Sequence, residues 1–358
     1  MKRRIGLLTS GGDCPGLNAA IRGVARAAYE TFESVEIVGI ADGYLGLITG
    51  EYKEMTRGDF SGILTRGGTI LGTSRQPYRK MRPTVEDDFD RVRAMKDNFK
   101  KMKLDCLVGL GGNGTHKTLN LLSEEGLPVI GLPKTIDNDI WGTDVTFGFQ
   151  TAVEIATDVI DRIHTTADSH GRAMVVELMG NKAGWLALYS GIAGGADVVL
   201  IPEIPYDVDK VVDAVAARVA AKKSFSIIAV AEGAMSVGEA ALKKRDRETL
   251  RTENPYKTVA HRIAEQISQK MLMEARAVIP GHVQRGGSPC PYDRVLSTRL
   301  GVHAAGLIKS ETYGVTVAML GDSVGHNPLR NVAGINKLVP ANHQMIKTAR
   351  EIGIQFGD

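Results

Sequence analysis

The sequence predicts an α/β protein with two Rossmann-like, three-layer α/β/α domains built on mostly parallel sheets. Short apolar runs alternate with helical periodicity along the chain, which is the pattern of consecutive strand–helix–strand units. Glycine clusters follow three of these runs, at the places where such folds hold their ligands. The length of 358 residues corresponds to two domains at about 150 residues each.

The order of the elements follows from the apolar pattern. Apolar side chains recur at positions 21, 24, 25, 28, 29 and 32, which is one face of a helix. Asn18 is placed to cap that helix. The segment Ala152–Ile163 has the same periodicity. We expect strands at residues 4–9, 35–40, 105–110, 129–132, 172–178, 197–201, 225–231, 275–279 and 315–320.

A domain boundary is expected near residue 148, where a polar loop gives way to the second helix. The first domain then comprises residues 1–148 and about 284–334, and the second comprises 149–283 and about 335–358. The segment Lys243–Lys257 is dense in both charge signs. This density indicates a solvated surface, with a partner site as the alternative.

Composition excludes several classes of protein. The net charge of +3 is too small to indicate a nucleic-acid partner. Cys14, Cys106 and Cys290 are far apart and lack a CxxC pattern, which disfavours zinc and a disulfide framework. The basic start Met1–Arg4 is followed by an apolar run too short for a signal peptide. No apolar stretch approaches the roughly 18 residues of a membrane span. We therefore expect a cytoplasmic protein with reduced thiols and no membrane partner.

The glycine clusters indicate phosphate ligands. They lie at residues 10–16, 109–115 and 284–288, where strands give way to helices. A helix N-terminus presents unpaired N–H groups, and glycine lets the backbone approach an anion closely. The middle cluster also matches the dinucleotide pattern GxGxxG. The strand that should end in a ribose-binding acid ends in Pro133-Lys134, so a dehydrogenase is only a minor alternative.

The loop Lys134–Asp139 carries two carboxylates, an amide and a hydroxyl just beyond a strand. A solvated turn held by side-chain hydrogen bonds would explain this composition. Beside two phosphate loops, a carboxylate that accepts a hydroxyl proton is the sharper interpretation. Phosphoryl transfer needs such a base, cations around the transferred group and usually a metal ion.

Five segments resemble the phosphofructokinases in sequence and in order. They are residues 5–18, 42–47, 66–69, 135–139 and 281–289. The resemblance implies a phosphoryl transfer to the 1-hydroxyl of fructose 6-phosphate in a cleft between the two domains. The first domain would bind the donor and the second the sugar phosphate. It also implies Mg²⁺ as cofactor and a homo-oligomer, expected to be a tetramer, in which a neighbouring subunit supplies some sugar-phosphate contacts.

The resemblance also implies roles for individual residues. Asp137 resembles the general base, with Thr135 and Lys134 beside it in the catalytic group. The donor site would comprise Gly12, Tyr44, Arg75, Gln76, Gly112, Asn113, Gly114 and Thr115. The sugar-phosphate site would comprise Thr135, Ile136, Asp137, Arg172, Met179, Gly180, Asn181, Glu232, Arg276, His282 and Arg285. Asp139 and Asn113 are the candidate Mg²⁺ ligands.

Three departures from the family pattern affect these roles. Asn113 stands where an acid is usual, so metal binding would rest on donor phosphates, water and Asp139. Asn181 replaces a usual arginine, with Lys182 or Lys134 as candidate substitutes. The regulatory site of bacterial members is partly present. It keeps Arg22, Arg26, Arg57 and Lys223, while His164 and Ala221 stand at positions where family members usually have basic residues. Control by ADP or phosphoenolpyruvate is therefore not expected.

Two positions disagree about the phosphoryl donor. Lys134 resembles the pyrophosphate-dependent branch, whereas Gly114 resembles the ATP-dependent branch, because an aspartate there would repel an α-phosphate. We predict an ATP-dependent 6-phosphofructokinase that forms fructose 1,6-bisphosphate. A pyrophosphate-dependent enzyme is the main alternative, and a non-catalytic binding subunit is the next. Acceptance of other sugar phosphates stays open.

Overall fold

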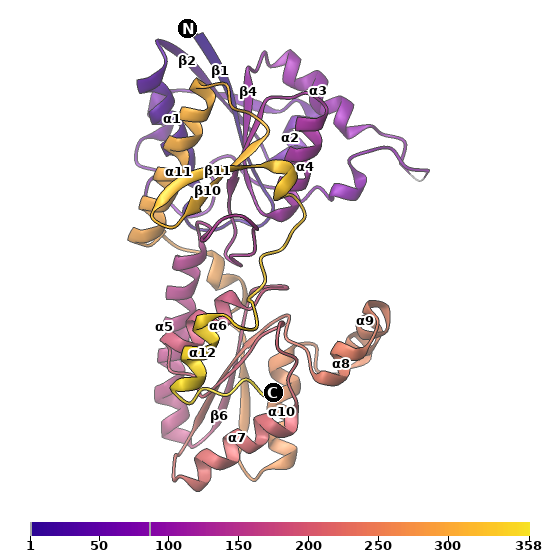
Figure 1. The fold of residues 1–358 in the computed structure, drawn as a ribbon, viewed down its shortest axis with the longest axis vertical. Coiled ribbons are helices and arrows are strands. Elements are labelled where there is room, and N and C mark those ends of the chain that lie inside the picture. Colours follow the sequence, from indigo (N-terminus) through magenta and orange to yellow (C-terminus); the bar gives the residue numbers. More distant parts are fainter. Residues whose placement is uncertain (1, 86) are drawn as a thin grey trace. The chain divides into compact units, whose positions relative to one another are not determined.

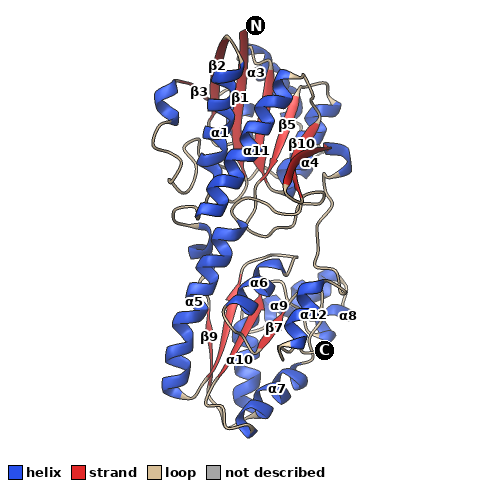
Figure 2. Cartoon of the chain, turned by 60° about the vertical axis from the view of Figure 1, so that its left-hand side comes forward, coloured by secondary structure: helices blue, strands red, loops and turns tan. Residues whose placement is uncertain are grey.

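Strands form where the sequence places apolar runs between turn residues, and amphipathic segments between them form helices. The structure, a computed structural model, describes residues 2–85 and 87–358. These residues group into two units. Unit 1 contains the described residues up to Ile136, Ile140–Thr151 and Arg285–Lys337, and unit 2 contains Asp137–Asp139, Ala152–Gln284 and Leu338–Asp358. The alternation of strands and helices confirms the α/β class (Figures 1 and 2).

The sheet of unit 1 is mostly parallel. Its strand order is β11-β10-β5-β4-β1-β2-β3, and the two outermost pairings are antiparallel. The strands are β1 (Lys2–Ser10), β2 (Ser34–Ile40), β3 (Tyr52–Met55), β4 (Cys106–Gly111), β5 (Val129–Pro133), β10 (Val315–Leu320) and β11 (Ser323–Pro328). β3 and β11 were not expected from the sequence, because their residues are mostly exposed or half-buried and lack an apolar run.

Helices cover both faces of this sheet (Figure 1). α1 packs along α11 on one face. On the other face, α2, α3 and α4 close an apolar core that includes Leu47, Met95 and Leu119. The helices are α1 (Leu17–Thr31), α2 (Tyr44–Thr49), α3 (Arg91–Lys101), α4 (Asn113–Glu124) and α11 (Pro291–Lys309), with short 3-10 turns η1 (Arg57–Phe60), η2 (Tyr78–Lys80) and η4 (Leu329–Asn331).

Unit 2 is built on four parallel strands in the order β7-β8-β6-β9. α7 and α10 cover one face with a core that includes Val211, Val215 and Ile263. The elements are β6 (Ala173–Leu178), β7 (Val198–Leu200), β8 (Ser226–Ala231), β9 (Ala275–Val278), α5 (Phe149–His170), α6 (Trp185–Ala193), α7 (Val208–Ala220), α8 (Val237–Ala241), α9 (Lys244–Glu253), α10 (Val259–Lys270), η3 (Gly281–Arg285) and α12 (Gln344–Glu351).

The expected cap of the first helix is wrong. α1 begins at Leu17 after Gly16, which has a left-handed φ of 102° and caps without a side chain. Asn18 therefore lies inside the helix and is fully buried. Its amide nitrogen donates to the carbonyls of Arg66 and Gly67 at 3.0 and 3.2 Å, and its oxygen accepts from Ile70 N at 2.8 Å. Asn18 thus fixes the 66–70 loop.

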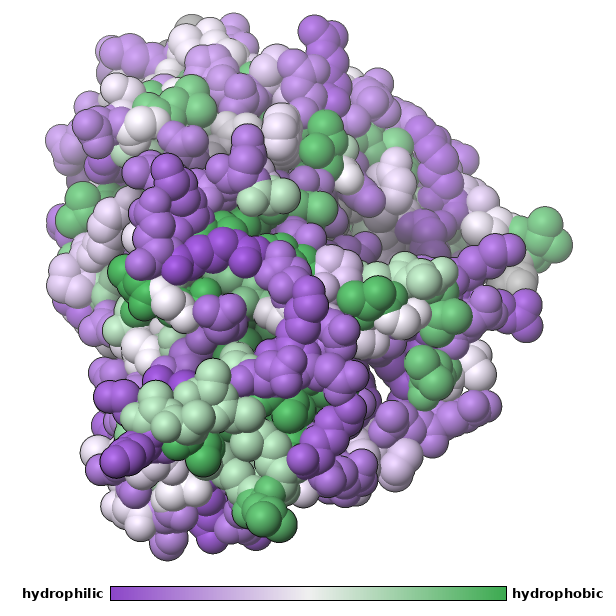
Figure 3. All heavy atoms as spheres, turned by 60° about the horizontal axis from the view of Figure 1, so that its bottom comes forward, coloured by the Kyte–Doolittle hydropathy of each residue, from purple (hydrophilic) through white to green (hydrophobic). Residues whose placement is uncertain are grey.

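The surface is mainly hydrophilic on the face shown in Figure 3, with hydrophobic residues in small groups. Within the described part of the chain, every helix is too short or too polar to cross a bilayer.

The start of α5 depends on a buried carboxylate from α11. Asp293 is fully buried. It accepts hydrogen bonds from Gly148 N at 3.0 Å, Thr151 N at 2.8 Å and the Thr151 hydroxyl at 2.6 Å. These are N–H groups that the first turn of a helix leaves unpaired. The contact also fixes the beginning of α11, which directly follows the third glycine cluster.

We predict that Asp293→Ala lowers the free energy of unfolding by about 2–4 kcal/mol, because it leaves buried donors without an acceptor. Urea unfolding followed by circular dichroism measures the change. Asp97→Ala, on an exposed face of α3, is the matched control and should change stability by less than about 0.5 kcal/mol. An equally small effect at Asp293 would contradict this role.

Candidate active site

Three loops of unit 1 begin side by side at the carboxyl edge of its sheet. In the parallel register, Ser10 of β1 lies opposite Gly111 of β4, and Gly111 lies opposite Pro133 of β5. The strands therefore deliver the first glycine cluster, the second glycine cluster and the loop from Lys134 to one place. Open α/β sheets bind their ligands at this edge.

Two cations flank Gly12 in the first cluster. The Lys134 side chain is 3% exposed, and its ammonium donates to the Gly12 carbonyl. Arg285 donates to the Asp13 carbonyl at 3.2 Å. A Cβ at position 12 would lie 3.0 Å from the Arg285 guanidinium. The backbone at Gly12 therefore lies close to both cations, and a side chain at position 12 would require the Arg285 guanidinium to shift.

The second cluster forms the N-terminus of α4. Gly111 has no room for a side chain, because a Cβ there would overlap Thr115. A Cβ at Gly114, in contrast, would meet no atom within 4 Å. The first-turn N–H groups of a helix carry partial positive charge and lack intrahelical partners. This end of α4 can therefore receive a phosphate, with open space beside Gly114.

Two buried side chains support this turn from behind. Tyr44 is 1% exposed, and its hydroxyl donates to Thr115 O at 2.8 Å. His116 is fully buried, with Nδ1 2.9 Å from Gly112 O and Nε2 2.8 Å from the Thr316 hydroxyl. Burial lowers the pKa of His116 to about 4, so the ring is neutral at physiological pH. We expected Tyr44 in the donor site; in the structure its side chain holds the loop backbone.

The segment with Arg75 and Gln76 lies against the first cluster. Gly11 N donates to Ser74 O at 3.1 Å, and the Thr73 hydroxyl donates to Gly11 O at 2.7 Å. Arg75 is exposed. This pairing places Arg75 and Gln76 next to the loop that contains Gly12.

The 66–70 loop joins the same region. A Cβ at Gly67 would overlap the carbonyl of Gly287, and the Ser288 hydroxyl donates to Thr65 O. The third glycine cluster thus lies directly against residues 65–67.

Asn113 serves as a structural link. Its side-chain oxygen accepts from Gly334 N at 2.8 Å, and its nitrogen donates to Ile335 O at 3.2 Å and to the Asn336 side chain. A metal ion at this oxygen would have to displace the bond from Gly334. The contacts favour a role in holding the 334–336 segment over a role as metal ligand.

Hydrogen bonds fix the backbone at the start of the loop from Lys134 to Asp139. Lys134 N donates to Gly111 O at 3.1 Å, and the Thr135 carbonyl accepts from the Thr146 hydroxyl at 2.7 Å. Ile136 is fully buried, and Asn138 has a left-handed φ of 51°. Asp137 and Asp139 are both half-buried. The fixed backbone presents two carboxylates from one short turn.

Unit 2 gathers another set of expected residues at the carboxyl edge of its own sheet. Glu232 N donates to Leu178 O at 2.8 Å, and Asn181 N donates to the Glu232 carboxylate at 2.9 Å. Gln284 is fully buried. Its oxygen accepts from Met179 N at 3.2 Å and its nitrogen donates to Gly281 O at 3.1 Å. Gln284 thereby joins the Met179–Asn181 loop to the turn that carries His282.

Arg172 and Arg276 lie at the opposite edge of that sheet. Arg172 directly precedes β6, whereas Met179 directly follows it. Arg276 pairs with Met174, near the start of β6. Both arginines bind the Glu274 carboxylate, Arg172 at 2.5 Å. Six residues of strand span about 20 Å, so these arginines cannot share one small ligand with Met179 and Glu232 of the same chain.

The retained regulatory-type residues of unit 1 also come together. Arg22, Arg26 and Arg57 line a cavity of about 480 Å³ beside Tyr29. Burial lowers the pKa of Arg22, and the neighbouring Arg26 lowers it further. Lys223 lines a different cavity, in unit 2 with Asp197 and Arg218.

Sequence reasoning missed Gln284, His116 and Glu274. Gln284 lies inside a recognised motif, but the sequence does not show that its amide bridges two loops. His116 follows the second cluster within one helical turn, which is a signal that could have been used. The distance from Arg172 to Glu274 along the chain hides their contact until the pairing of β6 with β9 is known.

Comparison with known proteins agrees with the motifs. The family model described as Phosphofructokinase matches residues 4–308. An ATP-dependent 6-phosphofructokinase of Spirochaeta thermophila is 54% identical over 99% of this chain and 98% of that protein. ATP-dependent 6-phosphofructokinase 3 of Bacteroides thetaiotaomicron is 46% identical over 99% of this chain and 100% of that protein.

Solved structures share the fold. Phosphofructokinase of Pichia pastoris in the T-state superposes with a TM-score of 0.80 at 31% identity, covering 99% of this chain but 37% of that longer chain. A pyrophosphate-dependent phosphofructokinase of Marinobacter aquaeolei gives a TM-score of 0.78 at 21% identity, covering 94% of this chain and 86% of that one, a likeness of fold alone. The family model covers most of the chain, and a relative at 54% identity matches it over nearly its whole length. The chain therefore belongs to the phosphofructokinase family.

Proposed function

We propose that this protein is an ATP-dependent 6-phosphofructokinase, which transfers the γ-phosphoryl group of ATP to the 1-hydroxyl of fructose 6-phosphate. The observation that carries the proposal is the open space at Gly114, at the N-terminus of α4. Full-length relatives at 54% and 46% identity bear this name. The reaction product is fructose 1,6-bisphosphate.

Donor choice rests on Gly114 and Lys134 together. ATP needs room for an α-phosphate and a nucleoside beyond its two outer phosphates, and position 114 leaves that room. Lys134 favours pyrophosphate by resemblance, but its ammonium bonds to the Gly12 carbonyl. A cation held at the first loop can neutralise phosphate charge with either donor. Space at Gly114 therefore decides for ATP, and pyrophosphate is the second candidate.

Asp137 is the proposed general base. A carboxylate next to the sugar can take the proton of the 1-hydroxyl while the hydroxyl oxygen attacks the γ-phosphorus of ATP. ADP then leaves with the oxygen that bridged the β- and γ-phosphates. Lys134 and Arg285 flank Gly12 and would offset the charge that develops on the transferred group. Thr135 and Ile136 fix the backbone from which Asp137 projects.

Mg²⁺ fits the carboxylates of this loop better than it fits Asn113. The Asn113 oxygen already accepts from Gly334 N, whereas Asp139 is half-buried on the same turn as Asp137. Magnesium prefers carboxylate, phosphate and water oxygens in an octahedral arrangement. We propose that Asp139 and the donor phosphates hold the ion, which would supply positive charge at the phosphates.

The opposite placement of the sugar-phosphate residues supports a homo-oligomer. Met179, Glu232 and His282 follow strands of unit 2, while Arg172 and Arg276 stand at the starts of strands. If all five bind the same substrate, the two arginines must come from a second copy. The guanidinium groups of that second copy are suited to the 6-phosphate of the sugar bound by the first copy. We propose that Gln284 positions the part of the sugar-phosphate site at Met179 and His282, and that Glu274 positions the part formed by Arg172 and Arg276.

Asp137→Asn should keep affinity for fructose 6-phosphate and lower kcat by about 10²–10⁴-fold, because the amide cannot accept the hydroxyl proton. Steady-state kinetics with ATP measure kcat, and equilibrium titration measures sugar-phosphate affinity. Asp213→Asn, an exposed acid of α7, should leave both values unchanged. A kcat for Asp137→Asn within threefold of wild type would exclude it as the base.

Gly114→Asp should reduce kcat/KM for ATP at least tenfold, since about 1.4 kcal/mol of repulsion suffices for that factor. The fold should be retained, because position 114 has free space and an acid in the first turn suits the helix dipole. Gly306→Asp is the control, a helical glycine that also has free space around it. Unchanged use of ATP at saturating sugar phosphate would refute the steric argument.

Mixing two inactive variants tests the shared site. The Arg276→Ser variant lacks an arginine that one subunit would give to its neighbour's sugar-phosphate site. The Asp137→Asn variant lacks the proposed general base. The two variants are refolded together in equal amounts. Across a two-fold interface, half of the dimers then contain one subunit of each variant, and each of these mixed dimers has one intact site and one doubly mutated site. We therefore expect about a quarter of wild-type activity. No recovery above either variant alone would indicate that each chain builds its site unaided.

A further inference from the structure

The segment that carries α8 and α9 encloses a cavity that the proposed reaction does not use. The cavity holds about 380 Å³. It is lined by the start of α7 with the connection before it, by α8 with the connection before it, by the end of α9 with Asn254 just beyond it, and by α10. This volume lies within the range of about 300–1,000 Å³ typical of small-molecule sites. All of its lining residues belong to unit 2.

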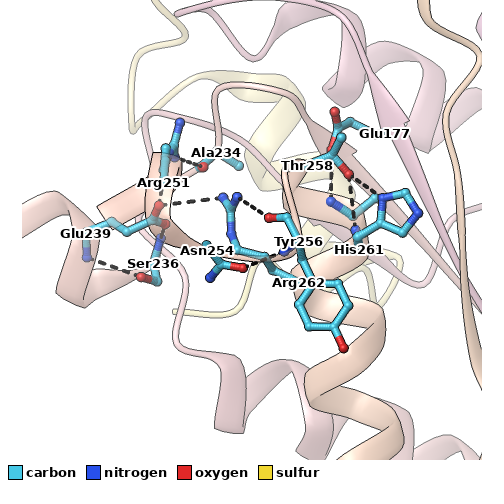
Figure 4. Close-up of polar contacts among 11 residues, drawn as sticks. Glu177, Ala234, Ser236, Glu239, Arg251, Asn254, Tyr256, Thr258, His261 and Arg262 are labelled. Carbon is cyan, nitrogen blue, oxygen red and sulfur yellow. Dashed lines mark hydrogen bonds and ion pairs between the residues drawn. The ribbon is translucent and has the colours of Figure 1, made fainter. Parts of the chain in front are cut away.

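A buried carboxylate flanked by two arginines forms one wall of this cavity. Figure 4 shows Arg251 and Arg262 pointing toward Glu239 from α9 and α10. Arg251 Nε donates to Glu239 at 2.7 Å, and Arg262 Nη2 lies 3.6 Å from the same oxygen. The other oxygen of Glu239 accepts from Ser236 N at 3.0 Å. Burial raises the pKa of Glu239, but these bonds and charges outweigh it and lower the pKa overall.

The arginines have more donors than this wall uses. Arg262 is 9% exposed, yet its Nη2 makes no hydrogen bond within the described residues. Arg251 donates from Nε to Glu239 and from Nη2 to Ala234 O at 3.0 Å, and its Nη1 has no acceptor among the residues that the structure describes. The Asn254 oxygen accepts from Tyr256 N at 2.8 Å, which leaves its amide nitrogen available. One arginine would neutralise Glu239, and the formal charge of the other is matched by Asp207 of the same lining.

Asp207 is the remaining charged group of the cavity lining. Its carboxylate accepts from Asp209 N at 2.9 Å and caps α7. The positive dipole end of that helix offsets part of its charge. A buried guanidinium with incomplete partners is costly, and an oxyanion in the cavity would complete the partners of both arginines. Val208, Val237 and Leu250 line the apolar part.

We propose that this cavity binds a small organic anion. Its phosphate or carboxylate group pairs with Arg251 and Arg262, and its apolar part lies against Val208, Val237 and Leu250. The ligand would also tie α9 to the rest of unit 2. α9 has no buried residue and extends from the edge of the unit (Figure 1), so the bonds of Arg251 carry much of its attachment.

Hydrogen exchange of the full chain tests this binding, read at the backbone amides of residues 244–253. The probes are phenyl phosphate and benzoate, with benzyl alcohol as the neutral control, each titrated to roughly 20 mM because fragments of this size bind weakly. We expect at least one charged probe to slow exchange of α9 about threefold or more, saturably, and benzyl alcohol to have no effect. The stronger of the two charged probes identifies the preferred group.

Leu250→Glu supplies the decisive variant. Leu250 is 46% exposed, so the new carboxylate enters the cavity mouth without disturbing the core and should abolish the protection. Leu242→Glu changes a leucine that is 38% exposed on the same segment but outside the cavity lining, and it should bind as wild type does. The proposal is overturned if neither charged probe protects α9, if benzyl alcohol protects it equally, or if Leu250→Glu remains protected.

Discussion

The bond between the Lys134 ammonium and the Gly12 carbonyl is the contact on which the donor side depends. Lys134 is nearly buried, and a buried charge is tolerated only with close polar partners. Because β1, β4 and β5 end in parallel register, this one bond can join the first glycine loop to the turn that carries Asp137. The Arg285 guanidinium also lies close to Gly12, so two cations contact this loop.

Packing against neighbouring atoms requires glycine at some positions of these loops but not at Gly114. A side chain at Gly67 or Gly111 would overlap neighbouring atoms, whereas one at Gly114 would not. Packing therefore explains the first two glycines, and it leaves Gly114 without a structural reason. Space for a ligand is the remaining physical reason for glycine at that position, which is why this residue carries the donor assignment.

Much of the fold was predictable because parallel strands give strong local signals. Nine expected strands correspond to β1, β2 and β4–β10, and most of them are short buried apolar runs, although β9 is only partly buried. β3 and β11 are exposed edge strands without that signal. The contacts of Asn18, Asn113 and Glu274 could not be predicted, because each joins segments distant in sequence. Motif resemblance identified Arg172 and Arg276 as site residues. Only the pairing of β6 with β9 showed that they lie at the edge of the sheet opposite to Met179.

The donor itself is the most direct test of this account. The wild-type protein should be assayed with fructose 6-phosphate and Mg²⁺, using ATP and pyrophosphate in parallel, and the two kcat/KM values compared. Open space at Gly114 predicts that ATP is preferred by at least about tenfold, equivalent to 1.4 kcal/mol in the transition state. A preference for pyrophosphate would show that Lys134, and not Gly114, determines the donor.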